Sequence, residues 1–334
     1  MRKTAILLTL SVCMLACTSP TGNNLHVSIV SEKPTKNIVA AYDGFDKGKG
    51  NTSVAFDAAN VYKWSGESPF EHETLGYFDS MGREIAYIKR DRDLGQTFTY
   101  TGSATKIWKS VTVRLGFGTN VVRQGMYGKN ISIQIFEITG EPVLNNNGSN
   151  EKVEAFHGFP HNRPGDSIAS IRDDYFIGET YTSIGVFTGA KFPSKTNFGF
   201  TSDTTSVSPD DSRVKGRFLR FEFPVSAKIE LQPGKKYAFL LMIDEMGSDV
   251  GFTLANNYYG SYEGGHGIRR DGNGVFPPVP ADPAKDFTDP ANKKALESAH
   301  FPTNFQERIK ISPGTNGYPD VCTWRDLSFF IEVE

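Results

Sequence analysis

The stretch LQPGKKYAFLLMI (residues 231–243) carries the clearest fold signal in the chain. Pro233 and Gly234 predict a tight turn, because proline presets its own φ and glycine accepts a positive φ. The run KYAFLLMI (236–243) after this turn is almost continuously apolar. Such a run predicts a strand that is buried on both faces, at the centre of a sheet.

Segments of a similar kind recur from about residue 95 to the C-terminus. Each is rich in β-branched and aromatic residues and is bounded by Gly, Pro, Asn or Asp, which is typical of strands joined by turns. The predicted strands are QTFTYT (96–101), KIWKSVTVRLG (106–116), ISIQIFEI (131–138), RFLRFEFPV (217–225), AKIELQ (227–232), VGFTLA (250–255) and LSFFIEV (327–333).

Core positions follow from the alternation of apolar and polar residues in two of these segments. An irregularity in the alternation is expected near Trp108-Lys109. The predicted core positions are Ile107, Val111, Val113, Leu115, Ile131, Ile133 and Ile135.

Helical signal is scarce. The best candidate is DPANKKALESAH (289–300), where Asp289 can cap the helix and Pro290 suits the first helical position. No period of 20–50 residues repeats, which argues against solenoids and propellers. Many short strands, Gly/Pro turns and one short helix in a long C-terminal loop predict an all-β fold, an antiparallel β-sandwich of the jelly-roll kind.

The N-terminal part of the predicted domain, residues 38–94, has a less regular pattern and many aromatic residues. A segment of this size without disulfides would be marginal alone, so we expect it to pack onto the sandwich. The sequence therefore predicts a single domain over residues 38–334. Cys322, left without a pairing partner, is interpreted as a small buried hydrophobe.

The charge balance of the 334-residue chain excludes one class of partner. Its formal net charge is −2 and its pI is near 6.3, with charges of both signs interspersed. That composition carries no electrostatic footprint for nucleic acid.

The first seventeen residues, MRKTAILLTLSVCMLAC, differ in kind from the rest. A basic start, a short apolar run and a small residue before Cys17 describe a secretory signal that is too short for a membrane-spanning helix. The placement of Cys17 after Ala16 resembles a bacterial lipobox, although Met14 stands where lipoboxes usually have Leu. The resemblance implies that Cys17 is acylated, with palmitate among its lipids, and becomes the first mature residue.

The segment after Cys17 is rich in Ser, Thr, Asn and Pro, so residues 18–37 are predicted to be a flexible tether. A lipid on Cys17 would make the membrane a partner and place the protein in the cell envelope, at the outer membrane. Resemblance to lipoproteins of Bacteroidetes raises the question of surface display. The acidic cluster that often marks surface export there is absent from this tether, and the facing side stays open.

Three segments resemble β-sandwich modules of exported bacterial proteins, which are similar to carbohydrate-binding modules. They are RDLGQTFTYTG (92–102), LQPGKKYAFLL (231–241) and DLSFFIEV (326–333). The resemblance implies a first strand after an Asp-Leu-Gly corner, a turn before a central strand and a closing edge strand. It also implies a polysaccharide or other glycan as the ligand.

The stretch NNYYGSYEGGHGIRRDGNG (256–274) is the best candidate for a ligand-binding loop. Sugar binding needs flat aromatic faces flanked by polar groups, and this stretch supplies both. An equally weighted interpretation is that some tyrosines only cover the end of the sandwich. Trp108 and Trp324 are expected in the core, whereas Trp64 lies in a loop-like segment. The candidate ligand-binding residues are Tyr258, Tyr259, Tyr262, Arg269, Asp271 and Trp64.

A structural Ca²⁺ is a weaker hypothesis. Calcium prefers six to eight oxygen ligands, and the segment DEMGSD (244–249) offers Asp244 and Asp249. The favoured alternative is that these are turn residues that use Asp for local hydrogen bonds. No other cofactor is expected.

Catalysis has no local signature. A glycosidase needs two facing carboxylates, for which Asp244, Glu245 and Glu263 are available, and a lyase needs a base near an arginine. The set Tyr262, His266 and Arg269 could serve the lyase. Neither a nucleophile elbow nor a zinc or dinucleotide motif is present.

The leading functional hypothesis is therefore a non-catalytic, lipid-anchored β-sandwich that binds extracellular glycan through end loops. The first alternative is a jelly-roll glycoside hydrolase or polysaccharide lyase that uses the 256–274 loop. The second alternative is a structural or assembly lipoprotein.

Overall fold

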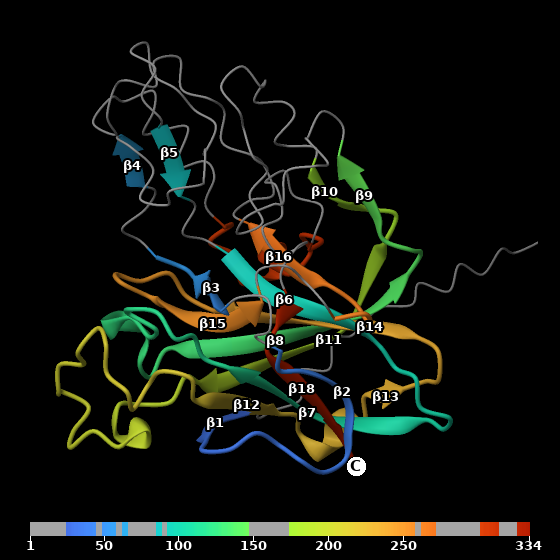
Figure 1. Cartoon of the computed structure of the whole chain (residues 1–334), viewed down its shortest axis with the longest axis horizontal. Helices are drawn as coiled ribbons and strands as arrows, with labels where there is room; N and C mark the ends of the chain where they lie inside the picture. The colour runs from blue at the N-terminus through green and yellow to red at the C-terminus, as the bar shows by residue number, and fades with distance from the viewer. Residues whose placement is uncertain are drawn as a thin grey trace, which may run out of the picture.

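The chain folds into a β-sandwich of two antiparallel sheets, as its strand pattern predicts (Figure 1). This computed structural model describes residues 25–44, 49–57, 62–65, 85–88, 92–146, 174–257, 262–271, 301–313 and 326–334.

The smaller sheet has the strand order β1-β12-β7-β18-β2, and β13 pairs with the first residues of β7. Its first strand pairs with β12 over five residue pairs. The strands are β1 (His26–Val30), β12 (Phe218–Glu222), β7 (Lys106–Arg114), β18 (Phe329–Val333), β2 (Ile38–Tyr42) and β13 (Glu230–Leu231).

The larger sheet has the order β11-β8-β14-β6-β3-β15-β17, and β16 pairs with β6. The strands are β11 (Thr180–Lys191), β8 (Asn130–Thr139), β14 (Lys236–Ile243), β6 (Arg92–Thr99), β3 (Lys49–Ala55), β15 (Gly251–Asn257), β17 (Asp326–Leu327) and β16 (Gly267–Asp271).

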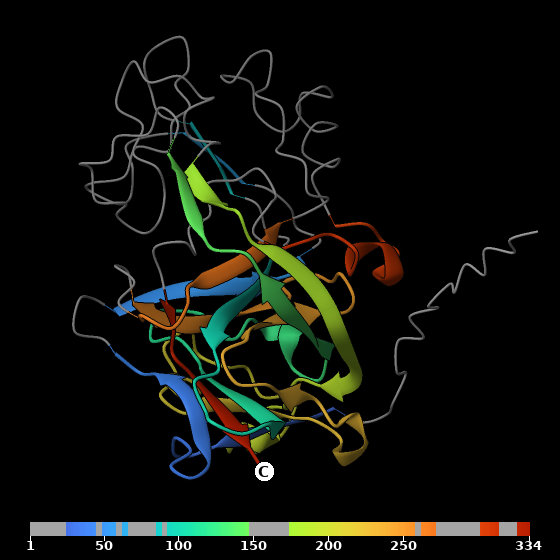
Figure 2. The ribbon, with the colours of Figure 1, turned by 90° about the vertical axis from the view of Figure 1, so that its right-hand side faces the viewer.

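Two further ribbons and four short helical turns complete the described elements. The β9–β10 ribbon continues the β8–β11 pair away from the larger sheet (green and yellow-green in Figure 2). Gly140 and Gly178, both at positive φ, stand where this ribbon begins. The remaining elements are β4 (Tyr62–Ser65), β5 (Ile85–Ile88), β9 (Val143–Asn146), β10 (Asp174–Ile177), η1 (Gln124–Met126), η3 (Thr196–Phe198), η4 (Val225–Ala227) and α3 (Phe305–Arg308).

Strand β14 is central, as predicted from its apolar run. It pairs with β6 on one side and with β8 on the other, and every residue from Tyr237 to Ile243 is buried. Gly234 takes a φ of 76° in the turn before it, a conformation that glycine adopts without strain.

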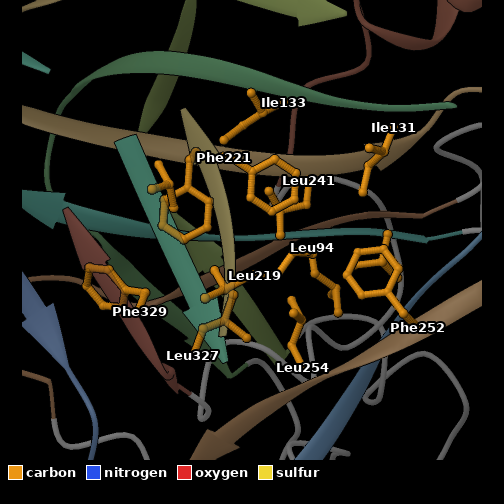
Figure 3. Packing of buried hydrophobic residues seen from close by; sticks show 14 of the residues in the cluster. Leu94, Ile131, Ile133, Leu219, Phe221, Leu241, Phe252, Leu254, Leu327 and Phe329 are labelled. Carbon is orange, nitrogen blue, oxygen red and sulfur yellow. The ribbon is translucent and has the colours of Figure 1, made fainter. Parts of the chain in front are cut away.

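The main core lies between the two sheets (Figure 3), where side chains of β7, β12 and β18 meet those of β6, β8 and β14. The predicted core positions are buried except Ile107, which is half-buried at the start of β7. Trp108 is 1% exposed, and its ring packs edge-on against Phe98 at 5.0 Å between centroids. A register shift of β18 against β7 falls at the predicted irregularity, because Lys109 has no opposite residue.

The opposite face of the larger sheet carries a second, smaller apolar cluster. Phe136, Ile138, Ala238, Leu240 and Ile268 form it. The two clusters explain why β14 has apolar residues on both faces: one set packs between the sheets and the other packs outside the larger sheet.

Three predictions about local structure are wrong. The predicted tether, residues 18–37, includes strand β1, which pairs with β12. Leu25, just before this strand, is 4% exposed, and the alternate apolar residues of HVSIV (26–30) pack against the core. The Asp-Leu-Gly corner is instead part of β6, because Asp93 is held inside the structure. Trp64 lies in strand β4, not in a loop.

Other predictions fall partly outside the described residues. The predicted helix over 289–300 is not among them, and the four-residue helix α3 follows at Phe305–Arg308. Within the irregular part, 38–94, β2 joins the smaller sheet and β3 the larger one.

In the described part of the chain, no helix has the length and apolar character needed to span a membrane.

Candidate functional site

The candidate site is a pocket where β6 ends and β14 begins, beneath the turn that leads into β16. Its volume is about 240 Å³. The turn approaches β6 closely, since the backbone N–H groups of Thr97 and Thr99 donate to the carbonyls of His266 and Gly264 at 2.8 Å each. The side chains that give the pocket its charge are Glu141, Glu179, Lys236, Glu263 and His266.

Glycine at position 265 allows this close approach. A Cβ atom there would lie 2.2 Å from the carbonyl oxygen of Thr97 and 2.5 Å from its hydroxyl. Any other residue would therefore push the turn away from β6 and change the shape of the pocket.

His266 is a buried polar residue of the pocket, with 7% of its surface exposed. Its Nε2 lies 2.7 Å from Oε2 of Glu179, and its Nδ1 lies 2.9 Å from the carbonyl oxygen of Gly267. The carbonyl can only accept a hydrogen bond, and so can the ionised carboxylate. Both ring nitrogens must then donate, so the geometry fits the charged imidazolium.

Glu179 is held in its ionised form by its neighbours. Burial would raise the pKa of this carboxyl, but hydrogen bonds from His266 and Tyr181, with the charges of His266 and Lys236, hold the pKa below its ordinary value. The Tyr181 hydroxyl donates to Oε2 at 2.7 Å. Glu179 and His266 therefore form a buried ion pair at the wall of the pocket.

The second cation of the pocket is also engaged. Lys236 Nζ donates to Oε2 of Glu141 at 2.5 Å and to the carbonyl of Gly140 at 3.0 Å. Glu263, in contrast, is exposed on the turn. Among the described residues its carboxylate has neither a hydrogen bond nor an ion pair.

Tyr262 faces the core and not the pocket. Its ring packs on Phe329 at 5.2 Å and on Tyr42 at 5.9 Å between centroids, and its backbone N–H donates to Asp326 at 2.9 Å. Burial, with the charge of Asp326, raises its pKa to about 12. This ring covers the end of the core, which is the alternative interpretation for the tyrosines.

Arg269, another candidate ligand-binding residue, lies in strand β16. It pairs with Leu94 across β16 and β6 and is only 4% exposed. Of the other candidates, Tyr258, Tyr259, Trp324 and Cys17 lie outside the described residues, as do the side chains of Asp271 and Trp64. Of the predicted ligand residues, the structure describes the side chains of Tyr262 and Arg269, and neither lines the pocket; the lining residues described come from the neighbouring turn and from strands distant in sequence.

The proposed calcium ligands serve local structure. The carboxylate of Asp244 accepts from Ser132 Oγ at 2.5 Å, and burial raises its pKa to about 6. Asp249, at a φ of 55°, accepts from the backbone N–H of Gln124 at 3.2 Å. No three metal-binding side chains are grouped anywhere in the described ranges.

The enzyme sets do not converge either. The pocket contains His266 but neither Tyr262 nor Arg269, and it contains Glu263 but not Asp244. His266 has both nitrogens committed as donors, so in this state it cannot take a proton from a substrate.

A buried charge cluster, which the sequence pattern does not reveal, holds the chain around the site in place. Asp93, Arg270 and Arg308 are each no more than 1% exposed. Asp93 Oδ2 accepts from Arg270 Nε at 2.8 Å and from Arg308 Nε at 3.2 Å, and Oδ1 accepts from Arg308 Nη2. One carboxylate of β6 thus joins β16 to helix α3.

Arg270 extends this attachment to the residues after α3. Its Nη1 donates to Gln134 Oε1 at 3.0 Å and to the carbonyl of Ile311 at 3.1 Å. Gln134 in turn donates to the carbonyl of Ile309 at 3.0 Å. The segment 301–313 is therefore fixed to the larger sheet by polar contacts.

Comparison of the chain with protein families, with curated proteins and with solved structures finds no match.

Proposed function

We propose that this protein is a non-catalytic, lipid-anchored β-sandwich that binds extracellular glycan, with the pocket at Glu263 and His266 as part of the binding surface. The observation that carries the proposal is a hollow of about 240 Å³ walled by carboxylates, an ammonium and hydroxyl-bearing residues. Sugar hydroxyls need such groups for orientation. The turn beside it continues directly from the tyrosine-rich stretch at 256–262.

The size of the pocket limits what it can hold. Pockets for drug-sized ligands occupy about 300–1,000 Å³. A hollow of about 240 Å³ is suited to one sugar ring or part of one. The rest of a chain would have to lie on neighbouring surface.

The anchor would keep the sandwich near the membrane. If Cys17 carries lipid, eight residue steps separate it from Leu25, which is buried against the core. At about 3.5 Å per residue that is roughly 28 Å when fully extended. Such a short tether supports a role at the cell envelope.

A polysaccharide panel tests the proposal. The purified mature chain is run in affinity gels containing each polysaccharide, and the same mixtures are assayed for new reducing or unsaturated ends. Retardation without release of ends is the expected result. Release of ends would make the protein an enzyme, and a panel with neither retardation nor release would refute glycan binding.

A matched pair of variants locates the binding site. We expect Glu263→Ala with Lys236→Ala to weaken retardation, because both residues wall the pocket. Glu230→Ala is the control, since Glu230 is exposed on β13 of the smaller sheet. Equal retardation of both variants and the original chain would place binding elsewhere.

A further inference from the structure

The pocket is lined by more negative than positive side chains. Three carboxylates, Glu141, Glu179 and Glu263, face two cations, Lys236 and His266. His266 counts as a cation because both its nitrogens must donate hydrogen bonds. One net negative charge therefore remains for a ligand to meet.

Both cations of the pocket already have acceptors within the protein. The ammonium of Lys236 contacts the carboxylate of Glu141 and the carbonyl of Gly140. The imidazolium of His266 is buried between Glu179 and Gly267. An incoming carboxylate or sulfate could accept only from the third N–H of Lys236, and there it would meet the negative charges of Glu141 and Glu263.

Apart from this N–H of Lys236, the charged groups that remain are acceptors. Glu263 is exposed at the rim and has no partner among the described residues. The second carboxylate oxygens of Glu141 and Glu179 can each accept another hydrogen bond. A ligand that donates, through hydroxyl groups or above all through an ammonium group, matches this set.

We propose that the pocket selects amino sugars, which carry an ammonium group, over neutral sugars, and neutral sugars over uronic acids and sulfated sugars. Glu263 is the residue that sets this order. The inference rests on the proposed function, because it names the sugar class that the same pocket binds. The ammonium lies against the Glu263 carboxylate, and the sugar hydroxyls donate to the remaining acceptors.

Calorimetric titration of the mature chain with three oligosaccharides of equal length tests the proposal. The probes are glucosamine oligomers, N-acetylglucosamine oligomers and galacturonate oligomers, at about pH 5.5, where a sugar amine is protonated. The expected order of affinity is cationic, then neutral, then anionic. Raising the salt concentration should weaken only the binding of the cationic probe.

The variant Glu263→Gln isolates the charge. Glutamine keeps the shape and the acceptor oxygen of the side chain. The affinity for the glucosamine oligomer should fall about fivefold, while the affinity for the neutral oligomer should change less than about twofold. Glu230→Gln, on the opposite sheet, should change neither.

The outcomes separate the two proposals. Tight binding of the galacturonate oligomer, or an unchanged preference in Glu263→Gln, would overturn the selectivity and leave glycan binding standing. If no oligosaccharide or polysaccharide binds at all, the proposed function falls and the selectivity falls with it.

Discussion

The substitution Asp93→Asn tests the buried charge cluster most directly. Asp93 is fully buried and accepts hydrogen bonds from the guanidinium groups of both Arg270 and Arg308. Asparagine has nearly the same shape but no charge. It would leave two buried guanidinium groups without a counter-ion and turn an NH₂ group toward one of them.

The expected cost follows from burial. Removing one partner of a buried ion pair typically costs about 3–5 kcal/mol, because the charge left behind has lost its hydration. Arg270 keeps its contacts with Gln134 and the carbonyl of Ile311, and Arg308 keeps the carbonyl of Ile243. These remaining acceptors place the expected loss of free energy of unfolding near the middle of that range, at about 4 kcal/mol.

Urea unfolding at pH 7, followed by tryptophan fluorescence, measures this loss. The slope of the free energy against urea should stay constant if only the folded state is affected. Asp210→Asn is the control, because it removes an exposed partner of Lys215, and its midpoint should match that of the original chain. A loss below about 1 kcal/mol for Asp93→Asn would refute the reasoning, because a loss of that size is typical of solvent-exposed ion pairs.

Three further substitutions have defined outcomes. The pKa of Asp244 is raised from 3.8 to about 6, mainly by burial, so stability is greatest while this carboxyl is protonated and falls as pH rises through about 4 to 6. At 1.36 kcal/mol per pKa unit the fall is about 3 kcal/mol, and Asp244→Asn should abolish it; parallel stability curves from pH 4 to 7 would contradict this. Gly265→Ala should weaken glycan retardation more than it changes the melting temperature, because the added Cβ would lie 2.2 Å from a carbonyl oxygen of β6; unchanged retardation would show that the turn does not shape the site. Mass spectrometry of the membrane-extracted protein should find an acylated Cys17 at its N-terminus, and Cys17→Ser should move the protein to the soluble fraction.

Much of the sandwich could be predicted because its signal is local. The period-two pattern of β8 and the unbroken apolar run of β14 depend on the neighbours of each residue along the chain and on the face they occupy. The strand β1 also had a signal, the alternate apolar residues of HVSIV. The polar composition of the residues around β1 favours a tether and outweighs that signal.

The charge cluster and the pocket could not be predicted, because their partners are distant in sequence. Asp93 meets Arg270 across 177 residues and Arg308 across 215. Its Asp-Leu-Gly context is typical of a turn, and only the pairing of β16 with β6 explains why the carboxylate stays in a strand. His266 and Glu179 are likewise 87 residues apart in the sequence, and the sequence pattern around neither residue indicates the other as its partner.

The attachment of Arg270 and Arg308 to one carboxylate closes a loop of the chain at its two ends. The 37 residues between them begin and end at the same point of β6. The entropy of closing a flexible loop grows only with the logarithm of its length, so doubling that number of residues would cost about 0.6 kcal/mol. The length of the segment between them can therefore change at little cost to the fold, provided that the three charged residues and Phe301, which is buried in the core, are kept.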